Sequence, residues 1–464
     1  MADTVFVGRT SDDAYALAGM GSAAALLTFS FYLFNFLCTV TTPLVSRCRA
    51  GGDLDGAIQI GKQSLSLALV IGGILSCSLI TFSQPLLEVM GADRNNYATS
   101  FLNLRAIAAP AVFFISASTG ILRGFLDTRT TFLILLGANV INFILDVILI
   151  SYLKMGPFGA AMATTSAEWI CAISLFFVLS AKIPSADRML GSNQRVIVVD
   201  RESASPAQNQ DMIVITPTFN IPDWEAIRPL VVASSSVFVR SFLLQLSIAG
   251  AAAMAARSGG SAGSEVAASS IAAHQIALQL WLLCSFICDA LAAASQTLVA
   301  DRLGCEDTAG VRNISRTIFL YSLGLGFILS AALGFGEITG FLKNIFTNDG
   351  PTQKALEPLL TILIFAQPLN SFVFAADGVL QGASEFSYQA KSMIFSVSIG
   401  LLSFLCLQNV GVQAELGLNA LQCVWYSLVS IQLMRGFTSL LKLVDSEGPI
   451  DLLYRAQEET GGAQ

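Results

Sequence analysis

The chain has 464 residues, of which 54% are hydrophobic and only 12% are charged, and its mean hydropathy is +0.67. A soluble globular chain carries about twice that share of charged residues. The composition therefore excludes a soluble protein and predicts an all-α protein that crosses the lipid bilayer many times. Acidic residues outnumber basic ones, 32 to 25, but they gather in loops and tails, and we expect no nucleic-acid partner.

Eleven apolar runs are long enough to cross a membrane. They lie at 14–46, 57–84, 97–123, 131–153, 158–181, 226–256, 267–301, 311–334, 356–381, 388–408 and 416–442. Nine cysteines are scattered through the chain without a CxxC pair. This pattern predicts small core residues rather than disulfides or metal ligands.

A short pattern occurs twice in the chain. Gly120–Gly124 is followed by Asp127, and Gly378–Gly382 is followed by Glu385 with the same spacing, 258 residues further along. Each copy is the end of an apolar helix followed by a charged turn. This self-similarity indicates that one half of the chain is a copy of the other.

A second pair of segments supports the duplication. Leu44 and Arg47 precede one polar turn, and Leu298 and Arg302 precede another at nearly the same offset. We therefore expect two pseudo-symmetric lobes of six helices. The expected parts are an N-lobe at 1–181, a cytoplasmic linker at 182–225, a C-lobe at 226–445 and a polar tail at 446–464.

The segment before the first apolar run is an apolar stub, Met1–Val7, which is too short to span a bilayer. A duplicated architecture requires an even number of helices. We therefore expect this stub to be the last third of a first helix whose beginning is missing from an N-terminally truncated chain. No signal or transit peptide pattern is present.

Lysine and arginine set the expected orientation. One set of turns and the tail hold 17 of the 25 basic residues and are predicted to be cytoplasmic. These segments are 47–62, 123–129, 182–228, 302–316, position 391 and the tail from 435. The linker at 182–225 is rich in Ser, Asn, Gln, Pro and charge, which favours a flexible connector over a regulatory lid.

Several charged residues fall within or beside apolar helices, where they are costly and indicate function. They are Asp3, Arg105, Asp146, Glu168, Arg240, Asp289 and Asp377. The two arginines could pair with two of the carboxylates in a purely structural role. The remaining acids could carry protons, because a low dielectric disfavours the charged carboxylate, or could contribute oxygens to a sodium site. Asn142 and Asp146 are four residues apart and share one helix face.

Six segments in chain order, together, resemble one transporter family. They are Ala2–Arg9, Gly120–Thr130, Asn142–Asp146, Ala272–Gln279, Asp289–Gln296 and Asp377–Ala383. The chain resembles the multidrug and toxic compound extrusion (MATE) family, particularly its plant-type eukaryotic branch. Val147 stands where the family's proline usually follows Asp146. The resemblance implies twelve helices in two lobes around a central cavity that opens alternately to each side.

The resemblance also implies roles for individual residues. Asp3, Asn142 and Asp146 would form a proton-coupling cluster in the N-lobe, and Asp377 would be an acid of the C-lobe cavity. Further C-lobe candidates are Asp289, Arg240, Gln275 and His274, although a packing role is the simpler interpretation of the histidine. Arg123, Gly124 and Asp127 would form the cytoplasmic turn. The helix at 226–256 carries Arg240 and no acid, which favours protons over sodium as the coupling ion.

The resulting hypothesis is a monomeric antiporter, not an enzyme, that exports organic solutes, xenobiotics or organic acids without a cofactor or bound metal. Arg240 favours organic anions as solutes, whereas the excess of membrane acids favours cations. Two alternatives are a lipid-linked saccharide flippase of the same superfamily and an intramembrane enzyme. A single histidine and the absence of HExxH argue against the enzyme. The expected location is the plasma membrane or an organelle membrane of a plastid or vacuole.

Overall fold

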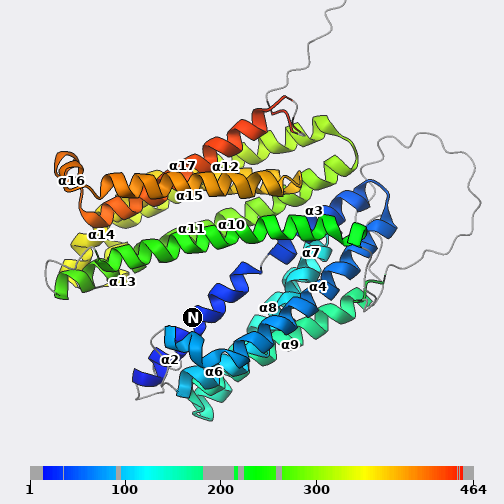
Figure 1. Cartoon of the computed structure of the whole chain (residues 1–464), viewed down its shortest axis with the longest axis horizontal. Coiled ribbons are helices and arrows are strands. Elements are labelled where there is room, and N and C mark those ends of the chain that lie inside the picture. The colour runs from blue at the N-terminus through cyan, green and yellow to red at the C-terminus, as the bar shows by residue number, and fades with distance from the viewer. Residues whose placement is uncertain are drawn as a thin grey trace, which may run out of the picture. The chain divides into compact units, whose positions relative to one another are not determined.

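The computed structural model describes residues 14–34, 36–89, 96–180, 214–217, 224–257, 264–347, 349–446, 448 and 450–452. Regular structure within these ranges is entirely helical. The chain divides into two compact units, a first unit at Met1–Ser234 and a second unit at Ser235–Gln464. The division falls inside α10 (Trp224–Arg257) (Figure 1). Asp3 lies outside the described residues.

Helices of the first unit precede α10. They are α2 (Ala14–Leu33), α3 (Phe36–Ala50), α4 (Leu54–Thr81), α5 (Ser83–Val89), α6 (Asn96–Ala106), α7 (Ala109–Gly124), α8 (Thr128–Asp146), the π-helix η1 (Val147–Tyr152) and α9 (Gly156–Ser180). Helices of the second unit follow α10. They are α11 (Ser264–Gly304), α12 (Thr308–Ile338), α13 (Phe341–Phe346), α14 (Gly350–Gly382), α15 (Phe386–Leu407), α16 (Val410–Leu416) and α17 (Ala420–Val444).

Each of the eleven predicted runs coincides with a helix or with two consecutive helices. Among the described residues, nine helices are long and apolar enough to span a membrane, or ten if α6 and α7, which meet at a bend of 43°, form one broken span. α17 occupies the eleventh run but is not one of these spans. It carries Gln432 and Arg435 on its buried face, which lowers its hydropathy.

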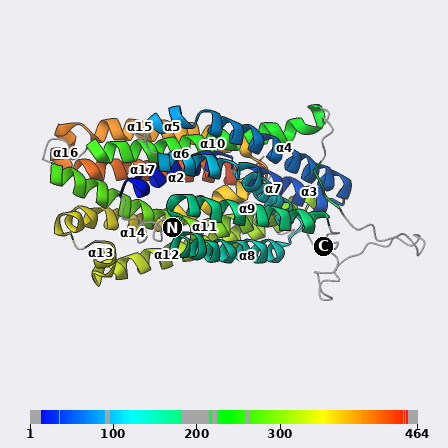
Figure 2. The same ribbon diagram turned by 90° about the horizontal axis from the view of Figure 1, so that it is seen from below.

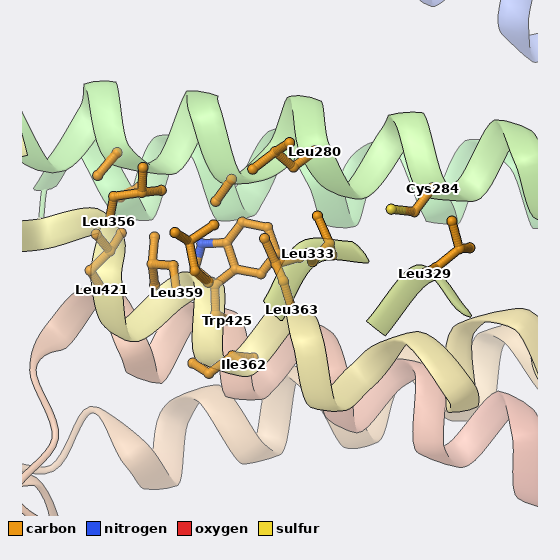
Figure 3. Packing of buried hydrophobic residues seen from close by; sticks show 14 of the residues in the cluster. Leu280, Cys284, Leu329, Leu333, Leu356, Leu359, Ile362, Leu363, Leu421 and Trp425 are labelled. Carbon is orange, nitrogen blue, oxygen red and sulfur yellow. The ribbon is translucent and has the colours of Figure 1, made fainter. Parts of the chain in front are cut away.

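α14 is the central helix of the second unit. It packs against α11, α12 and α17, and Figures 1 and 2 show these helices running side by side. Trp425 of α17 is buried among leucines of α11, α12 and α14, including Leu280, Leu333 and Leu363 (Figure 3). Lipid tails are as apolar as leucine, so close packing rather than transfer from water stabilises this core.

Paired glycines hold one helix pair together in each unit. A Cβ atom added at Gly124 would lie 2.7 Å from the Cβ of Val45, so α7 touches α3 through its backbone. A Cβ added at Gly382 would lie 2.9 Å from the Cβ of Val299, so α14 touches α11 in the same way. Both pairs of residues belong to the sequence repeat. The repeated glycines therefore encode equivalent backbone contacts.

The turn after each glycine pair also repeats its geometry. Leu126 and Ser384 adopt left-handed backbone conformations with φ of +63° and +62°. Asp127 then caps α8 by accepting a hydrogen bond from the backbone N–H of Thr130 at 3.0 Å. Glu385 stands at the N-cap of α15 without a side-chain capping bond. The two turns therefore share a backbone path but not a cap.

A short part of the predicted linker is docked on the first unit. Ile215 is fully buried, and its backbone N–H donates to the carbonyl oxygen of Leu179 at 3.0 Å. Its side chain packs near Gly61 of α4. Residues 214–217 are therefore anchored rather than a free connector, because an isoleucine there completes the apolar surface beside α9.

The prediction that the cysteines are core residues is wrong for three of the nine. Cys77, Cys305 and Cys406 are exposed. Cys77 and Cys406 lie on the outer faces of α4 and α15, and Cys305 lies in the turn after α11. In a membrane protein an exposed helix face meets lipid, so a small apolar thiol is tolerated there as well as in the core.

Candidate functional site

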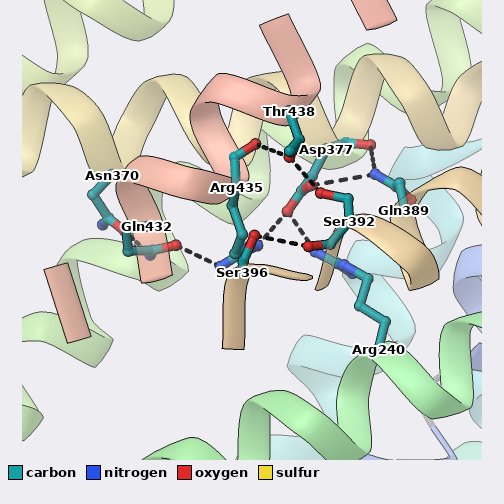
Figure 4. Close-up of polar contacts among 9 residues, drawn as sticks. All are labelled: Arg240, Asn370, Asp377, Gln389, Ser392, Ser396, Gln432, Arg435 and Thr438. Atoms are coloured by element: carbon teal, nitrogen blue, oxygen red, sulfur yellow. Dashed lines mark hydrogen bonds and ion pairs between the residues drawn. The ribbon is translucent and has the colours of Figure 1, made fainter. Parts of the chain in front are cut away.

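A buried carboxylate in the second unit is shared by two arginines (Figure 4). The side chains of Arg240 on α10 and Arg435 on α17 both donate to Oδ2 of Asp377 on α14. Gln389 on α15 donates to Oδ1 of Asp377 at 3.2 Å. The side chain of Asp377 is 8% exposed and that of Arg435 is 5% exposed, whereas that of Arg240 is 17% exposed. Four helices thus meet at one carboxylate.

This network continues along α17 toward the middle of the helices. Arg435 Nη1 donates to Gln432 Oε1 at 2.6 Å, and Gln432 Nε2 donates to Asn370 Oδ1 at 3.0 Å. Asn370 Nδ2 lies 3.4 Å from the hydroxyl oxygen of Ser285 on α11. Buried amides here satisfy one another across three helices, as a low-dielectric interior requires. We call Arg240, Asp377, Gln389, Gln432 and Arg435 the Asp377 cluster.

An apolar cavity of about 360 Å³ opens between α10, α15 and α17, and we call it the second-unit cavity. Its lining residues are Leu246, Ser247, Gly250, Ala251, Ala253, Met254, Val397, Gly400, Leu401, Phe404, Val424, Ser427, Leu428 and Ile431. A smaller cavity of about 50 Å³ adjoins it and shares Ser247, Leu428 and Ile431 with it. Gln432 of the Asp377 cluster lines the smaller cavity together with Trp281 and Trp425, at the same stretch of α17.

The first unit holds a second buried acid at an irregularity in its helix. Asp146 is fully buried, is the last residue of α8, and is followed directly by the π-helix η1. π-Turns are rare and concentrate at functional sites. Asn142 lies one turn earlier, and its Oδ1 atom is buried with no hydrogen-bond partner among the described residues. The predicted pair therefore shares one region of α8.

A cavity of about 270 Å³, whose lining mixes apolar and polar side chains, lies beside Asn142, between α7, α8 and α9, and we call it the first-unit cavity. Its lining residues are Val112, Ile115, Leu135, Ala138, Asn139, Asn142, Thr164, Ala167, Glu168 and Cys171. Glu168 forms a two-pronged ion pair with Arg105 of α6, whose Nη2 lies 2.9 Å from Oε1. Arg105 also lies 6.0 Å from the centre of the Phe31 ring.

The other predicted residues lie apart from these two clusters. His274 is buried and its ring stacks obliquely on Trp425 with centroids 5.7 Å apart, which fits the packing interpretation. Gln275 and Asp289 are exposed on α11. The Nη1 atom of Arg123 lies 3.8 Å from the sulfur of Cys38. Together with Gly124 and Asp127, whose contacts are described above, Arg123 belongs to the turn between α7 and α8.

The assignment of Arg435 to a cytoplasmic tail is wrong. Arg435 lies inside α17, nine residues before the helix ends at Val444, and is buried against Asp377. The orientation rule assumes that basic residues near the end of a chain are exposed to solvent. This arginine is instead paired with a carboxylate on α14. The rest of the Asp377 cluster that the sequence did not indicate consists of amides, Gln389 and Gln432. Their only signal was the presence of polar residues in apolar helices.

The family comparison decides what kind of protein carries these clusters. The MatE family model matches residues 1–148 and 260–404. The chain belongs to the MATE family. Both matched segments cover the repeat, so the duplicated helices and the family signature coincide. MATE proteins are transporters, not enzymes, and this chain is a multi-pass membrane protein.

Known relatives and solved structures agree with this assignment. Protein DETOXIFICATION 43 of Arabidopsis thaliana is 28% identical over 83% of this chain, and the chain spans 65% of that relative's length. Protein DETOXIFICATION 44, chloroplastic, of the same plant is 27% identical over 99% of this chain and 81% of its own length. An outward-facing multidrug resistance MATE family transporter has the same fold, with a TM-score of 0.76 at 18% identity over 95% of this chain and 89% of that one.

Proposed function

We propose that this MATE protein is a secondary antiporter that exports organic solutes in exchange for protons by alternating access. Asp146 holds the coupling proton, with Asn142 beside it, and Asp3 contributes to the same site as the family resemblance implies. The observation that carries the proposal is the full burial of Asp146 at the end of α8, next to η1. A carboxylate inside a membrane-length helix is a functional group by default, because its burial is costly.

Protonation of Asp146 removes a buried negative charge from the end of α8. The packing around that end therefore differs between the protonated and the ionised protein, and the two conformations have different proton affinities. Coupled exchange requires this difference. The π-turn that follows Asp146 supports the assignment, because residues at such a turn have neighbours that a continuous α-helix would not provide.

Protons are favoured over sodium by the chemistry of the second unit. Sodium binds to oxygen ligands that carry negative charge or dipoles. The carboxylate most available for this purpose, Asp377, already accepts hydrogen bonds from two guanidinium groups at a single oxygen. A metal cation placed there would be repelled by both Arg240 and Arg435.

The setting of the transporter is part of the proposal. Several of the plant relatives carry the word chloroplastic in their names, which favours an organelle membrane over the plasma membrane. We expect a monomer with an N-lobe at 1–181 and a C-lobe at 226–445, joined by a cytoplasmic linker at 182–225 and followed by a tail at 446–464. The exported solutes are small organic molecules.

Gradient-driven transport by an Asp146→Asn variant tests the coupling role. Asparagine imitates the protonated carboxyl permanently, so the variant should fold and still exchange labelled solute for unlabelled solute. Uptake driven by an imposed pH gradient into inverted vesicles should fall at least tenfold, measured with a labelled organic anion and a labelled organic cation. Asp55→Asn, the same change at an exposed acid in the first turn of α4, is the matched control.

Equal gradient-driven rates for wild type and Asp146→Asn would contradict the role of Asp146 and make Asp377 the next residue to change. A second arm replaces the pH gradient with a sodium gradient at constant pH. Uptake driven by sodium alone would overturn the choice of proton as the coupling ion.

A further inference from the structure

We propose that the second unit binds amphipathic organic monoanions, with the carboxylate of the ligand on Arg240 and its apolar body in the second-unit cavity. This inference names the substrate class for the export proposed above and rests on that function. It arises because a charged cluster and an apolar cavity lie within about two turns of each other on α10, α15 and α17.

The faces of α10 and α17 connect the cluster to the cavity. Arg240 and Leu244 are one turn apart, and Ser247 follows on the same face, about 10 Å along the helix from Arg240. On α17, Arg435 donates to Gln432, which lines the smaller cavity, and Leu428 lies one turn before Gln432 on the same face. A ligand can therefore reach the guanidinium region and the apolar cavity at the same time.

The charge of the cluster favours an anion. One oxygen of Asp377 accepts hydrogen bonds from two guanidinium groups, so two positively charged side chains meet at this point. Each guanidinium carries five N–H donors, and planar carboxylates match that geometry. Arg240 has the more exposed side chain of the two arginines, so it is the residue that an incoming carboxylate meets.

The cavity favours an apolar body. Its volume of about 360 Å³ lies within the range of small-molecule sites, about 300 to 1,000 Å³. Its two serines, Ser247 and Ser427, donate to the carbonyl oxygens of their own helices at 2.8 Å. Their hydroxyl protons are thus already used, and the other lining side chains are hydrocarbon or thioether. A small polar polyanion would gain no binding energy from these apolar side chains, whereas a fused aromatic ring would fill the cavity and contact them.

Binding is measured on the full chain in phosphatidylcholine nanodiscs without any ion gradient. The probes share one ring system: 2-naphthoate, the neutral 2-naphthamide and the cation 2-naphthylmethylammonium, with citrate as a polar polyanion. Tritiated 2-naphthoate should bind saturably and at least tenfold more tightly than the other three compounds. Equal affinity for all three naphthyl compounds, or tighter binding of citrate, would overturn the proposal.

Charge variants give effects of opposite sign. Arg240→Gln should weaken 2-naphthoate binding about tenfold, because it removes a charge-assisted hydrogen bond, and should leave 2-naphthamide binding unchanged. Asp377→Asn should tighten 2-naphthoate binding several-fold, because it removes the carboxylate that competes for the same guanidinium groups. If the cluster is only structural, 2-naphthoate should bind more weakly to both Arg240→Gln and Asp377→Asn. That result would overturn the proposal.

A cavity variant tests the position of the apolar body. Gly250 lines the second-unit cavity, and an added Cβ atom there would meet nothing within 4 Å. Gly250→Leu should therefore fold normally, fill the cavity and abolish the binding of both 2-naphthoate and 2-naphthamide. Gly324→Leu on α12 is the matched control, because its Cβ atom would also meet nothing within 4 Å. Unchanged binding in Gly250→Leu would place the ligand elsewhere.

Two further features of the binding assay separate this proposal from lipid binding at the same site and from the coupling role proposed for Asp146. Nanodiscs that contain phosphatidylglycerol test whether an acidic lipid takes the site, and loss of 2-naphthoate binding in them would overturn the small anion in favour of lipid. The binding assay uses wild-type protein without a gradient, so its outcome does not depend on the coupling role proposed for Asp146. Failure of proton coupling and failure of anion binding are therefore read out independently.

Discussion

The first-unit and second-unit cavities lie at corresponding places in the duplicated chain, but the first-unit cavity has more polar side chains in its lining. The first-unit cavity is lined by Asn139 and Asn142 of α8, and the second-unit cavity by Val397 and Gly400 of α15, 258 residues further along in each case. This is the offset of the repeated glycines. Duplication has kept the frame of the cavity and changed the chemistry of its wall.

The partner helices show the same divergence. Thr164, Ala167, Glu168 and Cys171 line the first-unit cavity from α9, and Val424, Ser427, Leu428 and Ile431 line the second-unit cavity from α17 with the same spacing. A carboxylate in one wall thus corresponds to a leucine in the other. The acid of the second unit stands instead on α14, beyond the cavity. The comparison therefore shows that equivalent positions of the two units carry side chains of different polarity.

The largest expected effect comes from substitutions that break the glycine contacts found in both units. A Cβ atom at Gly378 would lie 2.3 Å from the carbonyl oxygen of Ala292, whereas one at Gly120 would lie 3.0 Å from the Cβ of Thr41. Gly378→Ala should therefore cost about 3 kcal/mol of stability, the upper part of the range for overpacking, and Gly120→Ala about 1 kcal/mol. Thermal unfolding in detergent, followed by size-exclusion chromatography, measures both.

Gly73→Ala on α4 is the control for this pair, because its Cβ atom would meet nothing within 4 Å and alanine favours a helix. It should unfold at or above the wild-type temperature. Equal losses for Gly378→Ala and Gly120→Ala would show that the two helix pairs are equally close in solution, contrary to the difference between the units.

A smaller effect distinguishes the ion pairs of the units. Arg105→Gln leaves Glu168 without the arginine that it contacts, and it should cost about 2 kcal/mol, because the pair is mostly but not fully buried. Arg240→Gln should cost about half as much, because Asp377 keeps Arg435. The same unfolding assay applies to both variants.

The surface pair of Arg302 with Asp307, 3.3 Å apart and well exposed, provides the control for these arginines. Arg302→Gln should change stability by less than about 0.5 kcal/mol. The double variant Arg105→Gln with Glu168→Gln should recover part of the lost stability, because it also removes the negative charge of Glu168, which the single variant leaves without its arginine. A double variant no better than the single one would mean that the pair acts through packing rather than charge.

The smallest effect concerns the two turns. Asp127→Ala removes a side-chain cap from α8 and should cost about 1 kcal/mol. Glu385→Ala removes no cap and only a partly buried 3.5 Å contact with Lys442, which also pairs with Asp445, so its cost should stay below about 0.5 kcal/mol. Asp307→Ala, which removes the equivalent cap from α12, should behave like Asp127→Ala. A larger loss for Glu385→Ala than for Asp127→Ala would reverse this ranking.

The elements that depend on local pattern could be predicted from the sequence. Apolar runs of membrane length correspond to the helices, and the repeated glycines correspond to the helix contacts. The family assignment from short segments is also confirmed by the match over both halves. These features follow from residues close together in the chain, or from a spacing that the duplication repeats.

Only part of the polar network around Asp377 could be predicted from the sequence. Pairing of a membrane arginine with a carboxylate was expected, and Arg240 contacts Asp377, but the remaining members come from other helices. The position of Arg435 near the end of the chain suggested a solvated tail, yet a carboxylate on α14 draws it into the interior. Gln389 and Gln432 carry no charge and match no motif. Ile215 was hidden in a polar linker, although a single apolar side chain is enough to anchor a segment on an apolar surface. Such features depend on which surfaces meet.

The contact of Gly378 with the backbone of α11 also has a mechanical consequence. Two helices that touch through their main chains cannot roll or slide over each other without breaking that contact. We therefore expect α11 and α14 to move together as one rigid body. Asp377, one residue before Gly378, is part of this rigid body. A backbone movement that changes the distance between Asp377 and the two arginines must therefore come from bending or tilting of α10 and α17, which carry Arg240 and Arg435.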